Sequence, residues 1–250
     1  MLINKVALIT GGSSGIGFAY AEHLINQGWY VQIVSNDRGR SLDAIKKLNS
    51  PNVKNFIYDL TKKDSISMLC EEVKTPNLLI ACSGVATNGK AETYSDQEKA
   101  DTYYLMCGGV IDLIQKFIPK LSAQNNSRIV IISSIGAVTP MPKSSIYSSA
   151  KAAIYAYGRS LNAELKNITV TVSLPGYVKT DIHKKAGLNH LEKKIPSWMW
   201  VDVNKVVRET ERASLKGNSS VIPGFIYKLA RPFLGSNTAN KIWRFLSRRN

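Results

Sequence analysis

The sequence has few of the residues that build metal sites and disulfide frameworks. Three cysteines and three histidines are scattered through 250 residues, without a CxxC pair or the spacing of a zinc site. We therefore expect no metal and no disulfide. No apolar run spans a bilayer before a charge interrupts it. The N-terminal MLINKVALIT continues into TGGSSGIG without a cleavage site, so we interpret it as a strand and predict a cytoplasmic protein.

Acidic residues are absent from the C-terminal part of the chain. The net charge is +15, and no Asp or Glu follows Glu211. The basic residues beyond this point are Arg212, Lys216, Lys228, Arg231, Lys241, Arg244, Arg248 and Arg249. Such an excess suits a nucleic acid, an acidic membrane or a phosphate-rich ligand equally well. Because no groove-reading motif accompanies it, we expect no nucleic-acid partner.

Short runs rich in valine and isoleucine alternate with segments of helical length. The strand-like runs lie at 5–10, 30–35, 53–58, 77–82, 128–133, 168–173 and 219–223. The helical segments lie at 15–27, 41–49, 63–74, 94–122, 145–166 and 202–216, the last capped by Asp202. Near-continuous apolar strands are typical of a parallel sheet covered on both faces. The pattern predicts an α/β, Rossmann-like doubly wound sheet of about seven strands, in a single dinucleotide-binding catalytic domain over 1–250.

A glycine-rich segment follows the first predicted strand and opens a predicted helix. It reads Thr10-Gly11-Gly12-Ser13-Ser14-Gly15-Ile16-Gly17. Glycines permit a tight turn and a close backbone approach, and the unpaired N–H groups of a helix N-terminus bind a pyrophosphate. A glycine cluster is often only a turn, but this position favours a dinucleotide-binding loop.

A tyrosine and a lysine lie four residues apart in Tyr147-Ser148-Ser149-Ala150-Lys151. On a helix this spacing puts both side chains on one face. A nearby ammonium lowers the pKa of a phenol from its usual value near ~10, so the pair can act as a general acid or base. Such a pair is more often a solvated face. However, Ser134 ends a strand thirteen residues earlier, where its hydroxyl could hold a substrate oxygen.

Taken in order, the TGxxxGIG segment, Ser134 and the YxxxK pair resemble the short-chain dehydrogenase/reductase family. Asp59 resembles the family's adenine-contacting aspartate, and the segment from Pro175-Gly176 to Thr180 resembles the part around the nicotinamide. The resemblance covers residues 1–182. It implies an NAD(P)-dependent oxidoreductase that interconverts a carbonyl and an alcohol.

The resemblance also implies residue roles. Tyr147 would exchange a proton with the substrate oxygen, Lys151 would lower the tyrosine pKa and bind the nicotinamide ribose, and Ser134 would orient the carbonyl. Hydride transfer is the chemistry of the cofactor. The predicted cofactor-binding residues are Thr10, Gly11, Ser13, Ser14, Gly15, Ile16, Gly17, Ser35, Asn36, Arg38, Asp59, Gly84, Tyr147, Lys151, Pro175, Gly176, Val178 and Thr180.

Two positions depart from the family pattern. Met106 replaces an asparagine that completes a proton relay, and Ala81-Cys82-Ser83-Gly84 stands where Asn-Asn-Ala-Gly is usual. Either other groups rebuild the relay or turnover is reduced. A cofactor-binding regulator with reduced or lost catalysis is therefore the alternative to an enzyme.

The end of the second predicted strand bears on the choice of cofactor. An acid there would bind the ribose hydroxyls of NAD and repel a 2′-phosphate. Ser35 stands at that position, and Arg38 is close enough in sequence to pair with a phosphate. The sequence favours NADP, while Asp37 keeps NAD as an alternative.

Two C-terminal segments bear on substrate and partners. Residues 181–200 have no strand pattern and combine apolar Trp198-Met199-Trp200 with lysines, which predicts a lid suited to a lipid-like or acyl-carrier-linked substrate. The basic segment 224–250 carries an amphipathic stripe, formed by Ala239, Ile242, Trp243 and Leu246. The stripe predicts packing on the domain or on a sister subunit of a homo-oligomer (dimer or tetramer), or contact with an acidic membrane.

Overall fold

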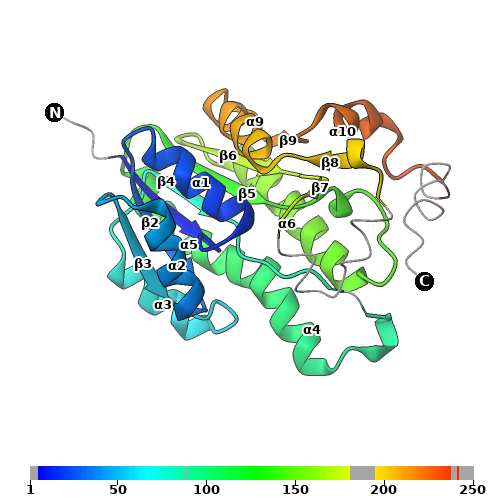
Figure 1. The fold of residues 1–250 in the computed structure, drawn as a ribbon, viewed down its shortest axis with the longest axis horizontal. Coiled ribbons are helices and arrows are strands. Elements are labelled where there is room, and N and C mark those ends of the chain that lie inside the picture. Colours follow the sequence, from blue (N-terminus) through cyan, green and yellow to red (C-terminus); the bar gives the residue numbers. More distant parts are fainter. Residues whose placement is uncertain (1–4, 88, 181–194, 238–240, 242–250) are drawn as a thin grey trace.

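A seven-stranded parallel sheet forms the centre of the part of the chain that the structure, a computed structural model, describes: residues 5–87, 89–180, 195–237 and 241 (Figure 1). The strand order is β3-β2-β1-β4-β5-β6-β9. The strands are β1 (Val6–Thr10), β2 (Tyr30–Ser35), β3 (Val53–Ile57), β4 (Leu78–Ala81), β5 (Ser127–Ile132), β6 (Ile168–Ser173) and β9 (Ser220–Val221). The predicted Rossmann-like, doubly wound sheet is thereby confirmed.

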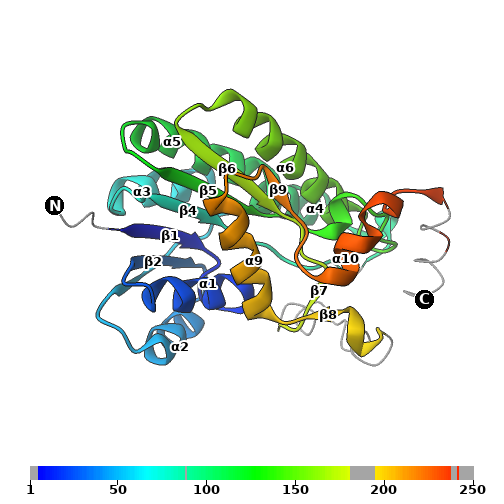
Figure 2. The same ribbon diagram turned by 90° about the horizontal axis from the view of Figure 1, so that it is seen from above.

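Helices cover both faces of this sheet, as Figure 2 shows from above. One face carries α1 (Gly15–Ile25), α2 (Arg38–Leu48) and α9 (Val203–Leu215). The opposite face carries α3 (Lys63–Glu72), α5 (Gly109–Ser122) and α6 (Ser145–Glu164). The predicted N-cap of the last long helix is confirmed, because the Asp202 side chain accepts the backbone N–H of Lys205 at 2.9 Å.

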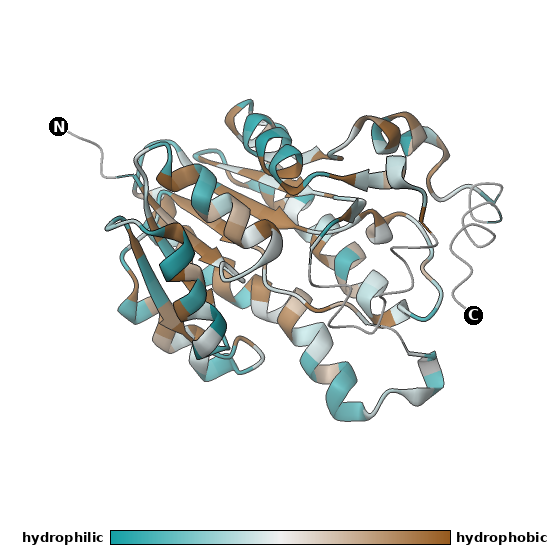
Figure 3. Ribbon diagram, in the orientation of Figure 1, coloured by the Kyte–Doolittle hydropathy of each residue, from teal (hydrophilic) through white to brown (hydrophobic). Residues whose placement is uncertain are grey.

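Both faces of the sheet are apolar, because successive side chains of a strand point to opposite faces and consecutive positions of the central strands are apolar. In β1, Leu8 belongs to the core beneath α3, α5 and α6, whereas Ala7 and Ile9 belong to the core beneath α1, α2 and α9. Figure 3 shows the resulting pattern, with hydrophobic strands at the centre and more hydrophilic helix surfaces outside.

The order of the sheet reverses at β1, which pairs with β2 on one side and with β4 on the other. The connections on the two sides of such a point leave in opposite directions. A crevice therefore opens at the carboxyl ends of these strands, which is where doubly wound sheets bind ligands. The glycine-rich segment follows β1 directly into this crevice.

The central segment predicted as helical over 94–122 is helical from Asp96 to Ser122, which confirms the prediction. It consists of α4 (Asp96–Tyr103), a π-helical turn at Tyr104–Gly108, and α5. A π turn holds an extra residue, so it shifts the direction of the side chains that follow it. The sequence did not predict this turn, because apolar periodicity does not reveal a one-residue insertion.

Two segments beyond β6 form short additional elements. The short strands β7 (Tyr177–Val178) and β8 (Trp200–Val201) pair in parallel, and the sequence pattern did not predict them. The first part of the predicted basic tail packs on the domain as α10 (Phe225–Ala230) and a 3-10 turn at Arg231–Phe233. The remaining tail residues 238–240 and 242–250 lie outside the described residues, as do 181–194 of the predicted lid.

A buried polar network joins α1 and α9 to β5. The Glu211 carboxylate of α9 accepts the Arg128 guanidinium at 2.8 Å and the Tyr20 hydroxyl at 2.8 Å. The Arg128 and Glu211 side chains are only 10% and 6% exposed. Removing one partner of a buried ion pair leaves the other charge buried without an opposite charge. This costs far more stability than the loss of an exposed pair.

We therefore predict that Glu211→Ala lowers the free energy of unfolding by about 3–5 kcal/mol, because it leaves the Arg128 charge buried and unpaired. Lys99→Ala, which breaks the pair of Lys99 with a fully exposed Asp96, should cost no more than about 1 kcal/mol. Urea unfolding followed by circular dichroism measures both. Equal losses in the two variants would contradict the assignment of Glu211 as a structural anchor.

Candidate active site

A cavity of about 440 Å³ lies at the carboxyl ends of the strands, beside the glycine-rich segment. Among the predicted cofactor-binding residues, all but Thr10, Gly17 and Arg38 line it. All three predicted catalytic residues line it as well, namely Ser134, Tyr147 and Lys151. The structure therefore brings together, in one continuous space, residues that lie more than a hundred positions apart in the sequence.

The glycine-rich segment turns tightly and lies close to its neighbours. Gly11 has a φ of +69°, which favours glycine, and its N–H donates to the Val34 carbonyl at 2.9 Å. A Cβ at Gly17 would lie 2.4 Å from the Gly11 carbonyl oxygen, so only glycine lets α1 start this close to the loop. Thr10 and Gly17 thus shape the loop from behind the cavity. The Thr10 hydroxyl accepts the N–H groups of Cys82 and Ser83 at 3.0 and 3.1 Å, which joins the ends of β1 and β4.

The N-terminus of α1 opens onto the cavity. Ser14, Gly15 and Ile16 line it, and Ser14 caps α1 without a side-chain hydrogen bond to the helix. The N–H groups of a first helical turn lack partners within the helix and carry the positive end of its dipole. This backbone therefore fits the pyrophosphate of a dinucleotide.

Lys151 is a buried cation at the centre of the site. It is 6% exposed, and its Nζ donates to the Ile132 carbonyl at 2.9 Å. The Ser133 hydroxyl donates to the Lys151 carbonyl at 2.8 Å and holds this turn of α6 against β5. The Nζ lies 5.9 Å from the centre of the Tyr147 ring, as expected for side chains on one helix face.

Burial lowers the pKa of Lys151 to about 8, because an ammonium group loses hydration inside the protein. The neighbouring thiols of Cys82 and Cys107 oppose this shift, but they are weak acids. Burial itself raises the pKa of Cys82 to about 11, so this thiol is neutral at pH 7. Lys151 consequently changes charge much closer to physiological pH than an exposed lysine does.

Ser134 lies at the end of β5, where the chain enters a short 3-10 turn at Ile135–Ala137. It is 8% exposed, and its Oγ accepts the Gly136 N–H at 3.1 Å. A capped turn of this kind fixes the direction of the hydroxyl. Ser134, Tyr147 and Lys151 therefore line one space, into which a substrate carbonyl can point.

Met106, which stands where the family pattern has an asparagine, lies in the neighbourhood of Lys151. It lies in the π turn, is 1% exposed and packs in a cluster with Cys107 and Ala150 against Tyr147. A Cβ at Gly84 would lie 3.6 Å from Lys151 Nζ and 3.7 Å from Met106 Sδ. The Met106 thioether is thus a close neighbour of Gly84 and of the region around Lys151 Nζ. A thioether is a weak hydrogen-bond acceptor and has no proton to donate.

The first turn of α2, just beyond the end of β2, contains two arginines with different surroundings. Asp37 caps α2, accepting the Arg40 N–H at 2.9 Å and pairing with Arg40 Nε at 2.7 Å. Arg40 lines the cavity, whereas Arg38 begins α2, is exposed and does not line it. Hydrogen bonds from the Arg40 backbone and side chain hold the pKa of Asp37 below its usual value. The sequence prediction named Arg38, but the structure brings Arg40 to the cavity instead.

Beside them, Ser35 accepts a hydrogen bond from the Ser13 hydroxyl at 3.0 Å. This bond joins the glycine-rich segment to the strand end at the place where an adenine ribose would lie. Asp59 lines the same part of the cavity, and its Oδ1 accepts the N–H of Thr61 at 3.0 Å. The predicted adenosine subsite is therefore assembled from three separate connections of the sheet.

Tyr227 in α10 supports the opposite end of the cavity, and sequence reasoning missed it. Its hydroxyl donates to the Met199 carbonyl at 2.8 Å and accepts the Tyr177 N–H at 3.1 Å. A Cβ at Gly176 would lie 2.1 Å from the Tyr227 ring, so the ring packs directly on the Pro175-Gly176 segment. No local motif marks this residue, since its partners lie about fifty and about thirty positions away.

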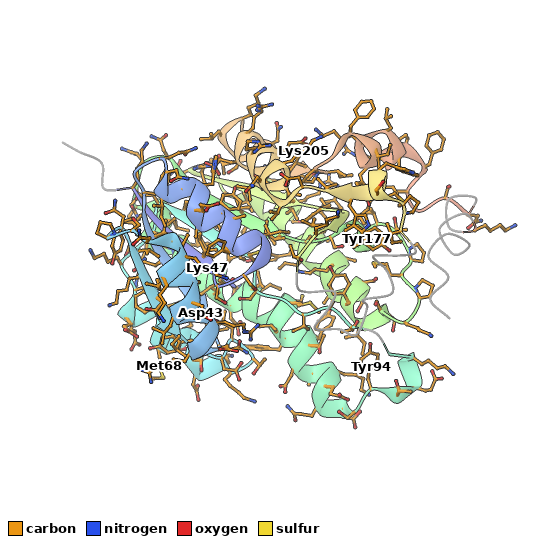
Figure 4. All side chains as sticks on the ribbon, viewed as in Figure 1. Asp43, Lys47, Met68, Tyr94, Tyr177 and Lys205 are labelled. Carbon is orange, nitrogen blue, oxygen red and sulfur yellow. The ribbon has the colours of Figure 1, made fainter. Side chains whose placement is uncertain are left out.

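The cavity also has apolar lining residues, among them Val85, Ala86, Leu105 and Met141. Ser144 lines it as well, and its hydroxyl donates to the Thr87 carbonyl at 2.6 Å. Figure 4 labels Tyr177, whose ring lies 5.5 Å from that of Trp200 and whose cluster includes Ile195 and Met199. Within the described residues there is no group of His, Cys, Asp or Glu side chains that could hold a metal ion.

Comparison with known proteins agrees with this geometry. Residues 5–190 match the short chain dehydrogenase family. A 3-oxoacyl-acyl-carrier-protein reductase, FabG, of Chlamydia trachomatis is 27% identical over 198 residues, covering 76% of this chain and 80% of that protein. An oxidoreductase of Staphylococcus saprophyticus is 31% identical over 191 residues, covering 72% of this chain and 81% of that protein.

Solved structures show the same fold. A short-chain dehydrogenase from Sphingobium yanoikuyae in complex with NADPH superposes with a TM-score of 0.80 at 24% identity, covering 93% of this chain and 96% of that one. A short-chain dehydrogenase/reductase from Burkholderia phymatum in complex with NAD gives a TM-score of 0.83 at 19% identity, covering 96% and 95%.

The sheet and the cavity at the carboxyl ends of its strands are of the Rossmann type, and together with the family match they support a nicotinamide-dependent oxidoreductase. The chain belongs to the short-chain dehydrogenase/reductase family. None of the described helices is both long and apolar enough to cross a membrane.

Proposed function

We propose that the protein is an NADP-preferring oxidoreductase that interconverts a carbonyl and an alcohol carrying an apolar, lipid-like or acyl-carrier-linked substituent. The observation that carries this proposal is the convergence of Ser134, Tyr147 and Lys151 on one cavity, whose lining also includes the α1 N-terminus and several apolar side chains. The acyl-carrier reductase named among the relatives supports the substrate class.

Each half of the bound cofactor would meet a different part of the chain. The pyrophosphate would lie at Ser14, Gly15 and Ile16, and the nicotinamide end against Lys151 and the Pro175-Gly176 segment. When bound, the cofactor supplies or accepts the hydride.

The proton follows a separate route through side chains. In the reducing direction Tyr147 donates its hydroxyl proton to the carbonyl oxygen, and Ser134 holds that oxygen in place. The ammonium of Lys151 stabilises the tyrosinate that remains. Because Met106 cannot pass on a proton, the tyrosinate must recover its proton through Lys151 or through solvent in the cavity.

Arg40 supports NADP over NAD. It lines the cavity near Ser35, where a 2′-phosphate would lie, and no acid stands at the strand end itself. Asp37, the residue that kept NAD as an alternative, uses its carboxylate to cap α2 and to hold Arg40. An arginine held in this way meets a phosphate with little further loss of side-chain freedom.

A cofactor-binding regulator is the second candidate, and Met106 is the observation that favours it. A buried thioether beside Gly84 would leave the cavity in place while offering no proton relay. NADPH binding without turnover of any carbonyl substrate would identify this function. A cytoplasmic location and assembly as a homo-oligomer stay predictions.

Three predictions test the proposed function, and the first of them concerns the proton donor. Tyr147→Phe should lower turnover by about 10²–10⁴-fold while leaving NADPH affinity nearly unchanged, because only the hydroxyl is removed. Lys151→Met should impair both. Stopped-flow kinetics and NADPH fluorescence titration measure the two effects, with Tyr155→Phe on the same helix as the matched control. Substantial activity in the Tyr147 variant would contradict the mechanism.

The second concerns cofactor choice. Arg40→Ala should weaken NADPH binding by about 1.5–3 kcal/mol, the usual value of a hydrogen bond to a charged group, and leave NADH binding unchanged. Arg38→Ala should affect neither, since Arg38 does not line the cavity. Fluorescence titration of both variants with both cofactors decides the matter. Equal losses for NADPH and NADH in Arg40→Ala would mean that this arginine meets no 2′-phosphate.

The third concerns pH. Because the pKa of Lys151 is lowered to about 8, its ammonium is present below that pH and lost above it. We expect kcat/KM for carbonyl reduction to be constant below pH 8 and to fall as pH rises beyond it. NADPH oxidation measured at 340 nm gives this profile. A rate that stays constant to pH 10 would show that the ammonium of Lys151 is not required.

A further inference from the structure

Helix α10 and the turn after it present a row of large apolar side chains to solvent. Phe225, Leu229 and Phe233 follow one another at intervals of four residues and are 66%, 58% and 65% exposed. Within the described residues, the exposed phenylalanines and tryptophans are these two phenylalanines and Trp198. Single exposed apolar side chains are ordinary on a surface, whereas a row of them marks an interaction site.

The direction of this row is fixed by the inner side of the same segment. Tyr227 is 2% exposed and bonded to Met199 and Tyr177, while Ile226 and Leu234 pack on the core cluster around it. The segment cannot rotate without breaking these contacts. The apolar row is therefore a permanent feature of the surface.

A basic stripe lies on the adjacent helix α9. The Glu209 carboxylate accepts the Gly224 N–H at 3.2 Å and pairs with Lys228 at 2.6 Å, so α9 and α10 are joined side by side. Lys205, Arg208 and Arg212 are all exposed and share one face of α9 by their spacing. Figure 4 labels Lys205 at the same edge of the molecule as α10 in Figure 1.

Few acidic residues offset this charge. From residue 202 onward the chain contains three acids: Asp202 caps α9, Glu209 pairs with the half-exposed Lys228, and Glu211 is buried with Arg128. The basic residues in the same range are Lys205, Arg208, Arg212, Lys216, Lys228, Arg231, Lys241, Arg244, Arg248 and Arg249. An apolar row beside an acid-poor, basic surface complements a lipid surface that carries negative headgroups.

We propose that α10 docks on the surface of an anionic phospholipid bilayer, with Phe225, Leu229 and Phe233 inserted among the headgroups and the basic stripe of α9 over them. This inference does not depend on the proposed activity. A second copy of the chain fits the surface less well. A stable dimer buries about 800 Å² per partner and leaves charged residues out of the interface core, whereas two copies joined here would bring like charges together around three side chains.

Docking would also orient the active site. The Tyr227 ring on the inner side of α10 packs on Gly176 and bonds to Tyr177, and both of these residues line the cavity. One side chain therefore separates the proposed membrane surface from the cavity wall. A substrate with a hydrocarbon chain could then reach the cavity from the bilayer with little passage through water.

Vesicle flotation of the full-length protein tests the proposal. The probes are vesicles of phosphatidylcholine alone and of phosphatidylcholine mixed with phosphatidylglycerol, each at low and high salt. We expect flotation with the anionic vesicles only, weakened by salt. Phe225→Ser/Phe233→Ser should lower the partition coefficient by about tenfold or more, because two apolar contacts are lost. Lys205→Gln/Arg208→Gln/Arg212→Gln should weaken binding to anionic vesicles as well.

Met68→Ser is the matched control, because Met68 is 57% exposed on α3 and lies at the opposite corner of the molecule in Figure 4. It should float like the unchanged protein, and the thermal melts of all variants should be alike. The proposal is overturned if the unchanged protein floats with neither vesicle, or if the phenylalanine variant floats undiminished. Sedimentation showing that this variant converts a dimer into a monomer, with no flotation of the parent, would assign the surface to a second copy instead.

Discussion

The burial of one ammonium group constrains the whole active site. Transfer of a charge out of water is expensive, and the pKa of Lys151 falls to about 8 as a result. Two hydrogen bonds hold Lys151 in place. Its Nζ donates to the Ile132 carbonyl at the end of β5, and its backbone carbonyl accepts the Ser133 hydroxyl. Burial lowers this pKa, and the thiols of Cys82 and Cys107 oppose the shift. In the proposed reaction, a tyrosinate formed at Tyr147 would favour the charged form of Lys151.

This constraint explains why the surrounding positions are small or apolar. Gly84 leaves the space next to Nζ open, since any Cβ there would lie 3.6 Å from it. Met106, Cys107 and Ala150 fill the other side without adding a charge. The site thus keeps its cation close to deprotonation, where a small change in its surroundings changes the charge state. Met106, which the family resemblance aligns with a relay asparagine, fits this arrangement because its thioether adds no charge beside Lys151.

Sequence reasoning reached the sheet, its helices and most of the cavity, because these depend on local patterns. Strands buried on both faces, a glycine turn between strand and helix, and a YxxxK pair each show their geometry within a few residues. Arg38 and Arg40 show where such reasoning ends. Both follow β2, and only the phase of α2 and the cap at Asp37 decide which of them reaches the cavity. Sequence distance from the strand carries no information about that phase.

Long-range supports are the second kind of feature that sequence patterns miss. Tyr227 was counted with a basic tail because its neighbours are basic, yet its hydroxyl bridges Tyr177 and Met199 and its ring covers Gly176. The π turn at Tyr104–Gly108, which sets where Met106 points, likewise leaves no trace in the apolar periodicity. Both features lie beside the cavity, since Tyr227 packs on Gly176 and a Cβ at Gly84 would lie 3.7 Å from Met106 Sδ. They show why the motifs that identify the family do not by themselves describe the walls of the cavity, and a family's fold alone does not specify its substrate.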